Sequence, residues 1–199
     1  LGHGNSSRFL ESHSFLDSTI IIDLSNDFRL KNDSRFEGRE FIYGLPEINK
    51  DAIKKSKSIA NPGCFATAIQ LGLLPLAKEN KLNNTIHINA TTGSTGAGVI
   101  SSPTSHFSWR NNNLSWYKPF THQHLGEIEE TLNQLQGKDI DILFLPQRGD
   151  FTRGIFVSSY TFFDGTLNDA FELYESFYKE EPFTQVSKKE LHLKLVINS

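Results

Sequence analysis

Runs of apolar and β-branched residues predict strands at intervals along the whole chain. These runs lie at residues 19–24, 57–60, 85–91, 139–145, 154–163 and 191–197. The run at 85–91 alternates apolar and polar side chains with period two, as a half-buried strand does. The run at 154–163 is the longest of the six, so we expect it to be central in its sheet.

Between these runs, apolar residues recur every three or four positions, which is typical of helices. Helices are predicted at residues 6–17, 64–80 and 125–135, with a fourth after a capping box formed by Thr166 and Asp169. The 64–80 segment is apolar on most sides and should be buried. Strands that alternate with helices predict an α/β (α+β) fold, in which helices cover a mixed sheet.

A polar segment at residues 101–119 interrupts this alternation without a clear period. It contains both tryptophans of the chain, and buried or stacked aromatic rings favour an ordered connection over a disordered one. We therefore expect a structured excursion here and no regular element.

Composition limits the possible partners. The chain has 199 residues, a formal net charge of −3 and no dense basic cluster, which argues against nucleic acid and against an anionic membrane surface. No apolar run approaches the roughly 20 residues of a membrane helix. The one cysteine excludes an internal disulfide, so we expect a cytoplasmic protein that acts on a small molecule or contacts another subunit.

The one cysteine, Cys64, follows Asn61, Pro62 and Gly63 at the predicted start of the 64–80 helix. Asn61 is a natural N-cap and Pro62 suits the first helical position, which would place the thiol in the first turn. There the helix dipole favours a thiolate nucleophile. The alternative is a small buried cysteine with no chemical role.

Two histidines, His122 and His124, precede the 125–135 helix, which carries Glu127. In an extended segment both rings would point to one face. A metal site would need further ligands that the sequence does not offer, so we expect no metal and assign the pair to acid–base chemistry. Alternatively, each histidine only solvates the start of the helix.

A glycine-rich loop follows the 85–91 strand. Its residues Gly93, Ser94, Gly96 and Gly98 can expose backbone N–H groups to a phosphate or a nicotinamide ribose. A flexible connection is the alternative interpretation of such a loop.

Two arginines stand at strand edges, Arg29 after the 19–24 run and Arg153 before the 154–163 run. A guanidinium can hold a carboxylate or phosphate through two parallel hydrogen bonds. Both are therefore candidate substrate-binding residues, and Glu127 is a third.

Taken together, several motifs in fixed order resemble the N-acetyl-γ-glutamyl-phosphate reductase family. The similar segments are residues 23–30, 43–47, 60–67, 93–98, 122–128 and 151–155. The Asn-Pro-Gly-Cys segment at 61–64 is the most specific of them.

This resemblance implies an NADPH-dependent oxidoreductase of arginine biosynthesis that reduces an acyl phosphate to a semialdehyde. It implies that Cys64 forms a thioester and that His122 moves the proton, with His124 and Glu127 orienting it, although the spacing does not decide between the two histidines. The glycine-rich loop at 93–98 would contact NADP(H). The family also implies a homo-oligomer, a dimer or a tetramer.

The family's cofactor motif is missing, since no G-x-G-x-x-G fingerprint occurs between a strand and a helix. We therefore expect residues 1–60 to be an incomplete remnant of a Rossmann-type NADP-binding domain and residues 61–199 to be the catalytic and oligomerisation domain. The chain would then be a fragment that is inactive alone and has little or no affinity for NADPH.

Other functions fit the same residues. A related reductase would act on N-succinylglutamyl, aspartyl or aminoadipyl phosphate. From a different class, Cys64 and a histidine would form a cofactor-free hydrolase or transferase, with the glycine-rich loop as its oxyanion site. A third possibility is a non-catalytic assembly domain that uses the aromatic residues of 107–120 as a subunit contact.

Overall fold

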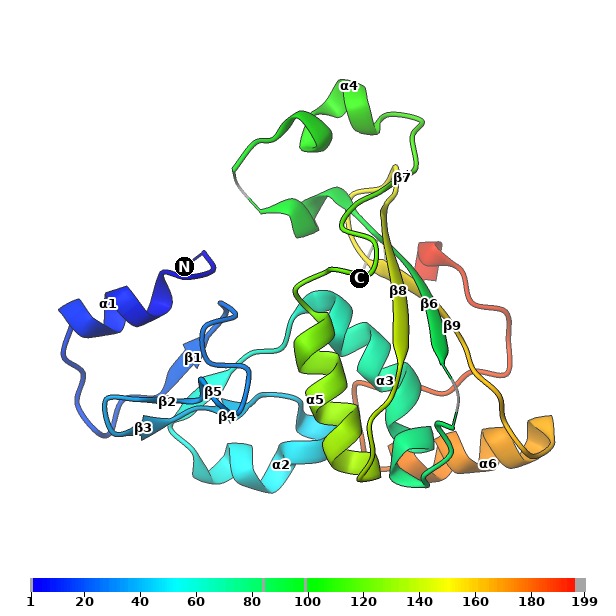
Figure 1. The fold of residues 1–199 in the computed structure, drawn as a ribbon, viewed down its shortest axis with the longest axis horizontal. Coiled ribbons are helices and arrows are strands. Elements are labelled where there is room, and N and C mark those ends of the chain that lie inside the picture. The colour runs from blue at the N-terminus through cyan, green and yellow to red at the C-terminus, as the bar shows by residue number, and fades with distance from the viewer. Residues whose placement is uncertain (1, 84, 99, 196–199) are drawn as a thin grey trace. The chain divides into compact units, whose positions relative to one another are not determined.

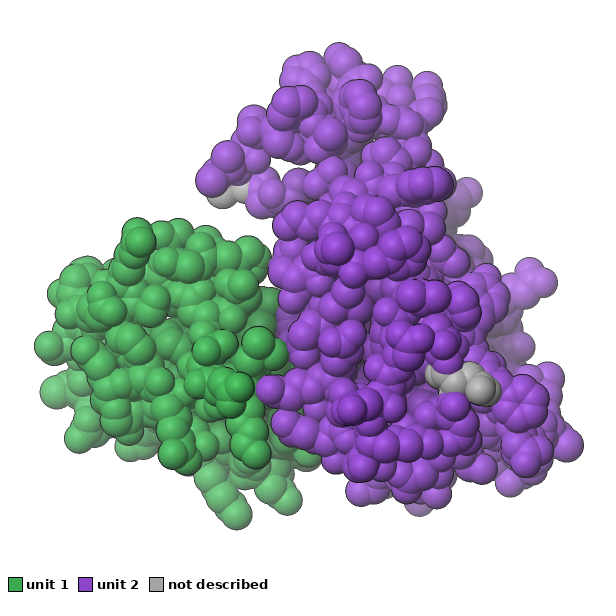
Figure 2. Space-filling view, in the orientation of Figure 1, with its two compact units in different colours: residues 1–67 green, residues 68–199 purple. Residues whose placement is uncertain are grey.

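The structure is a computed structural model that describes residues 2–83, 85–98 and 100–195. The chain forms two compact units, residues 1–67 and residues 68–199, which Figure 2 shows in different colours. The division falls inside a helix, later than the predicted boundary after residue 60. The identity of the two domains stays a prediction.

Unit 1 is built on a three-stranded parallel sheet. In spatial order its strands are β1 (Ile21–Asp23), β5 (Ser58–Ala60) and β4 (Ile42–Tyr43). Strands β1 and β5 confirm two of the runs predicted from the sequence. The predicted helix at residues 6–17 is present as the shorter α1 (Ser6–Ser12).

The core of unit 1 is small and aromatic. Phe28 and Phe41 stack with ring centroids 4.2 Å apart, and Leu10 and Ala60 are buried beside them. Besides β4, two further parts of the unit had no sequence prediction. They are the hairpin of β2 (Arg35–Phe36) and β3 (Arg39–Glu40), and helix α2 (Pro46–Lys55).

Helix α3 (Cys64–Lys78) confirms the predicted helix and is largely buried, as expected. Pro75 lies inside it and has no N–H group to donate to the carbonyl of Leu71. The hydroxyl of Tyr178 donates to that carbonyl instead, and the hydroxyl of Tyr174 donates to the carbonyl of Gly72. These two bonds explain how α3 continues past its proline. They also attach α6 (Leu167–Tyr178) to it.

Unit 2 is built on a mixed sheet of four strands. In spatial order they are β7 (Ser115–Trp116), β8 (Ile142–Arg148), β6 (Ile86–Thr92) and β9 (Ile155–Tyr160). Strand β6 is parallel to β8 and antiparallel to β9, and β7 is antiparallel to β8. The predicted mixed sheet and the α/β class are confirmed.

Helices α3 and α5 (Leu125–Gln136) cover one face of this sheet. Side chains of β6 alternate between buried and exposed, so Ile86 and Ile88 point to the same side as the buried Phe144 of β8. Both helices lie along that side, where Ile128 and Leu132 of α5 are fully buried (Figure 1). On the other side His87, Leu143 and Tyr160 form an exposed row across three strands.

Two strand predictions were wrong. Strand β9, from the long 154–163 run, lies at the edge of the sheet and not at its centre, because β6 pairs on both sides. No residue of β9 is buried, which suits an edge. The predicted strand at 191–197 is instead a single 3-10 turn at Leu193–Leu195, and its last two residues lie outside the described part of the chain.

The excursion at 101–119 is ordered, as predicted, but it contains short regular elements. These are a 3-10 turn (Pro103–Ser105), the one-turn helix α4 (Phe107–Arg110) and strand β7. The capping box at Thr166 and Asp169 is confirmed at the start of α6. The backbone N–H of Thr166, followed by its hydroxyl, lowers the pKa of the Asp169 carboxyl by hydrogen bonding.

Candidate functional site

Cys64 is the first residue of α3, and its side chain is exposed. The placement of the thiol in the first helical turn is confirmed, but the predicted cap was wrong by two residues. The helix begins at Cys64 and not at Pro62, so Asn61 is not the N-cap. The Asn61 side chain donates to the Pro62 carbonyl, and Thr67 closes the first turn by donating its N–H and its hydroxyl to the carbonyl of Gly63.

Buried side chains of unit 1 hold the segment that leads into Cys64. The N–H of Asn61 donates to the Asp23 carbonyl at 2.8 Å, which extends the pairing of β1 and β5. Nε of Arg29 donates to the Asn61 carbonyl at 2.9 Å, and its Nη2 donates to the Leu24 carbonyl at 3.1 Å. The backbone before Cys64 is therefore fixed by a guanidinium.

Arg29 is only 6% exposed, and two of its nitrogens bond backbone carbonyls. The other predicted substrate arginine, Arg153, is exposed in the connection between β8 and β9. The substrate-binding role of either stays a prediction. The contacts of Arg29 support a positioning role for it in the Cys64 segment.

In unit 2 the structure brings His122, His124 and Glu127 together at the start of α5, where they form a histidine centre. All three are buried, with 4–5% of each residue exposed. The two histidine rings meet edge to face with centroids 4.7 Å apart, and Nε2 of His124 lies 3.8 Å from Oε1 of Glu127. The carboxylate thus partners His124 directly.

The environment of His122 keeps its ring neutral. Burial lowers the pKa of His122 to about 4, and the charges of Lys118 and Arg148 act in the same direction. Its Nδ1 accepts the backbone N–H of His124 at 3.2 Å, so the neutral ring carries its proton on Nε2. At neutral pH this ring is a hydrogen-bond donor through Nε2.

Three residues that sequence reasoning missed support this centre. The rings of Tyr117 and Phe144 contact the His122 ring edge to face, each with a centroid separation of 5.5 Å. Gln70, which is fully buried in α3, donates from Nε2 to the Glu127 carbonyl at 3.1 Å. The available signal for Gln70 was an amide in the otherwise apolar face of the 64–80 helix.

The glycine-rich loop is not an open cradle of N–H groups. The N–H groups of Gly93, Ser94 and Thr95 donate to the carbonyls of the 151–154 connection at 2.9–3.0 Å, and that of Gly98 donates weakly to Thr95. A Cβ at Gly93 would lie 2.6 Å from the Thr152 carbonyl oxygen, so glycine is needed there for packing. The N–H groups of Gly93 and Ser94 are therefore not free for a ligand, although the sequence suggested that they would be. Cofactor binding by these two residues stays a prediction. A role for Gly96 and Gly98 stays a prediction.

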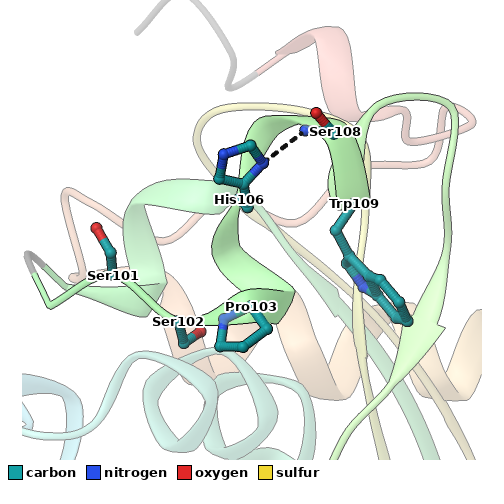
Figure 3. A pocket seen from close by; sticks show the side chains of 6 residues that line it. All are labelled: Ser101, Ser102, Pro103, His106, Ser108 and Trp109. Carbon is teal, nitrogen blue, oxygen red and sulfur yellow. Dashed lines mark hydrogen bonds between the residues drawn. The ribbon is translucent and has the colours of Figure 1, made fainter.

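Figure 3 shows a shallow pocket of about 550 Å³ in the 101–109 segment. Serines, Pro103, His106 and Trp109 line it, and Nδ1 of His106 accepts the N–H of Ser108 at 3.2 Å. None of the predicted site residues lies in it. Among residues 2–83, 85–98 and 100–195 there is no group of three or more His, Cys, Asp or Glu side chains able to hold a metal ion. In the same ranges no helix is long and apolar enough to cross a membrane.

The chain resembles known proteins in sequence. Residues 64–199 match the family model of the semialdehyde dehydrogenase dimerisation domain. The whole chain is 62% identical over 200 residues to an N-acetyl-gamma-glutamyl-phosphate reductase of Flavobacterium johnsoniae and 52% identical over 200 residues to one of Christiangramia forsetii. It spans 62% and 61% of the length of these two relatives.

Solved structures share the fold at low sequence identity. Aspartate semialdehyde dehydrogenase II from Vibrio cholerae, complexed with ASA, aligns with a TM-score of 0.59 at 13% identity, over 90% of this chain and 58% of that one. Aspartate semialdehyde dehydrogenase with NADP from Candida albicans aligns with a TM-score of 0.59 at 11% identity, over 87% and 53% of the two chains.

Proposed function

Because the chain belongs to the family of semialdehyde dehydrogenase dimerisation domains, we propose that it carries the catalytic part of an N-acetyl-γ-glutamyl-phosphate reductase. The proposed reaction is the NADPH-dependent reductive dephosphorylation of N-acetyl-γ-glutamyl phosphate to N-acetylglutamate semialdehyde. One observation carries it: the single cysteine is exposed at the first position of a buried helix. Sequence similarity to proteins of that name over the full length of the chain supports the choice of N-acetyl-γ-glutamyl phosphate as the substrate.

Cys64 would act as the nucleophile. Its Sγ attacks the γ-carbonyl carbon and forms an S–C bond, while the C–O bond to the phosphate breaks. Phosphate leaves, and the acyl group stays on Cys64 as a thioester. NADPH would supply the hydride that reduces the thioester. The N–H groups of Gly93, Ser94 and Thr95 are bonded within the chain, so we assign no cofactor contact to them. We expect isothermal titration to show little or no NADPH binding by this chain.

The histidine centre would handle the proton. Neutral His122 donates a hydrogen bond from Nε2 to the oxygen that becomes negative when the carbonyl is attacked. The family resemblance favoured His122 for proton transfer, but the low pKa of its buried ring argues for His124 in that role. His124 lies beside Glu127, whose carboxylate would balance an imidazolium. Single alanine replacements of His122 and His124 that both leave cofactor-free phosphate release intact would remove this assignment.

A single-turnover experiment tests the thioester. The chain is mixed with N-acetyl-γ-glutamyl phosphate without cofactor, and released phosphate and protein mass are followed. We expect one phosphate per chain and an added acyl mass on Cys64, both lost in Cys64→Ala and kept in Arg35→Gln, which changes an exposed arginine. Continuous hydrolysis without a thioester plateau would instead favour a cofactor-free hydrolase.

The alkylation of Cys64 gives a second readout that needs no turnover. We expect iodoacetamide to modify the thiol readily at pH 7, and an unreactive acyl-phosphate analogue to protect it. An unreactive thiol would favour a structural cysteine. Competition among N-acetylglutamyl, N-succinylglutamyl, aspartyl and aminoadipyl phosphates would identify the preferred substrate.

The open face of the unit 2 sheet suits a homo-oligomer, a dimer or a tetramer. Leu143, Phe156 and Tyr160 are 38%, 41% and 60% exposed on it. Such a row of apolar side chains is typical of a covered interface. Light scattering should show a smaller species for Phe156→Asp but not for Phe183→Asp, which changes an equally apolar side chain that is 96% exposed. If Trp116→Ser alone dissociates the oligomer, the contact lies on the 107–120 segment instead.

A further inference from the structure

Arg110 is a buried cation with an incomplete set of partners. It ends helix α4, is 7% exposed, and donates from Nη2 to the Gly149 carbonyl at 2.6 Å. Its Nη1 is also buried and has no hydrogen-bond acceptor among the residues that the structure describes. A buried charged donor without an acceptor costs free energy, so an anion that reached Nη1 would be strongly favoured.

A second arginine stands beside it. Arg148 ends strand β8, directly before Gly149, and its guanidinium lies 4.0 Å from the centroid of the Tyr117 ring. Its Nη1 donates to Oγ1 of Thr104 at 2.9 Å. Burial, and then the charge of Arg148, lower the pKa of Arg110, whereas Asp150 and Tyr117 raise it. The two like charges therefore act on each other, and Arg110 bonds the carbonyl of Gly149, the residue that follows Arg148.

The acidic group that acts on Arg110 is Asp150. Asp150 is exposed, and its Oδ2 accepts the backbone N–H of Asn112 at 2.7 Å. Lys118 adds a third positive charge, which acts with Arg148 on His122. The ring of Tyr117 lies against Arg148 and also contacts His122, so the arginine pair adjoins the histidine centre.

We propose that Arg110 and Arg148 form an oxyanion subsite that holds a carboxylate or phosphate group of the substrate next to His122. An anion there would give Nη1 of Arg110 its missing acceptor and separate the two positive charges. Planar guanidinium groups favour such two-oxygen ligands. The assignment of the anion to the substrate rests on the proposed function, whereas the binding of an anion does not.

The two tryptophans of the chain make the subsite directly observable. Trp109 precedes Arg110, and Trp116 pairs with Gln147, the neighbour of Arg148. The experiment follows tryptophan fluorescence while inorganic phosphate, acetate or succinate is added at constant ionic strength. A saturable change with any of them, weakened at least tenfold by Arg148→Gln, is expected.

The controls separate the subsite from other effects. Arg35→Gln removes an exposed arginine of unit 1 and should leave the titration unchanged. Arg148→Lys keeps the charge but loses the planar fork, so its binding should be intermediate. Arg148 is half-buried, so its variants carry the test even if Arg110→Gln fails to fold.

The ligand that saturates at the lowest concentration identifies the anion. Tightest binding of phosphate points to the acyl-phosphate end of the substrate, and tightest binding of acetate or succinate points to a carboxylate. No saturable change with any anion, or the same midpoint in wild type and Arg148→Gln, would overturn the subsite. The titration is repeated on Cys64→Ala, so failure of the thioester chemistry and failure of the subsite are measured separately.

Discussion

The Cys64 segment and the histidine centre use buried polar groups in opposite ways. In unit 1, buried side chains such as Arg29 serve the backbone, and the reactive thiol itself is exposed. In unit 2, the functional side chains are themselves buried, and the His124 N–H holds the His122 ring. The difference indicates that a nucleophile needs access and a fixed helix end, whereas an acid–base group is tuned by desolvation and neighbouring charge.

Of the changes considered, removal of the Arg29 guanidinium should have the largest effect on stability. Arg29→Met would leave the Asn61 and Leu24 carbonyls without their charged donor, at a cost of roughly 3–5 kcal/mol. Native-state hydrogen exchange should show faster exchange of the Asn61 N–H, which bonds the Asp23 carbonyl. The exposed Arg35→Met is the matched control. Unchanged exchange at Asn61 would mean that the segment before Cys64 needs no side-chain support.

Burial of His122 should make the stability of unit 2 depend on pH. The pKa is about 4 in the folded chain and 6.5 for an ordinary histidine, so between these values the unfolded chain binds the extra proton. Stability is therefore complete above pH 6.5 and falls as the pH drops towards 4, by at most about 3 kcal/mol. Urea unfolding of wild type and His122→Gln, followed by the tryptophans of unit 2, measures the difference.

Other groups also titrate in this range, so the comparison with His122→Gln isolates the histidine. The wild type should lose more stability than the variant between pH 6.5 and 4, with no further divergence below about pH 4. Parallel curves for the two proteins would mean that the His122 ring is hydrated and protonates normally.

Loss of the buried amide should have a smaller effect, confined to the histidine centre. Gln70→Met keeps the length of the side chain but removes the donor to the Glu127 carbonyl, at a cost of about 1–2 kcal/mol. We expect slower cofactor-free acylation of Cys64 by the acyl phosphate and a shifted pH profile of that step, with unchanged alkylation of Cys64 by iodoacetamide. Gln70→Leu, which also lacks the donor, should show the same shifted profile. An unchanged pH profile in both variants would leave Gln70 a packing residue.

The longer helices and strands could be predicted from local patterns, because the spacing of apolar residues within an element reflects which of its side chains are buried. The alternation in β6 and the cap at Thr166 belong to short stretches, and both predictions are confirmed. The order of the strands was less accessible, since β9 is the longest predicted run and still lies at the edge. Which strand is central depends on pairing between distant segments, and no local pattern records that pairing.

The candidate site also has parts that adjacent residues predicted and parts that they did not. The thiol in the first turn of α3 followed from adjacent residues, although the helix start was misplaced. The residues that support the histidine centre could not be predicted in this way, because Tyr117, Phe144 and Gln70 come from three separate segments. The glycine-rich loop shows the opposite error. Its composition suggested free N–H groups, and the 151–154 connection, far along the chain, binds them.

The smallest predicted effect tests whether the exposed charge of Lys118 contributes to the low pKa of the buried His122 ring. Lys118 is exposed, and its charge contributes to the low pKa of His122 after the larger effect of burial. Lys118→Gln should raise the midpoint of the His122 titration by less than the shift that burial causes, and added salt should reduce the difference. NMR of the ring carbons reports this directly, with Lys138→Gln as the control. A rise in Lys118→Gln alone would show that burial and surface charge act on His122 together; identical midpoints in all three proteins would leave desolvation as the dominant cause.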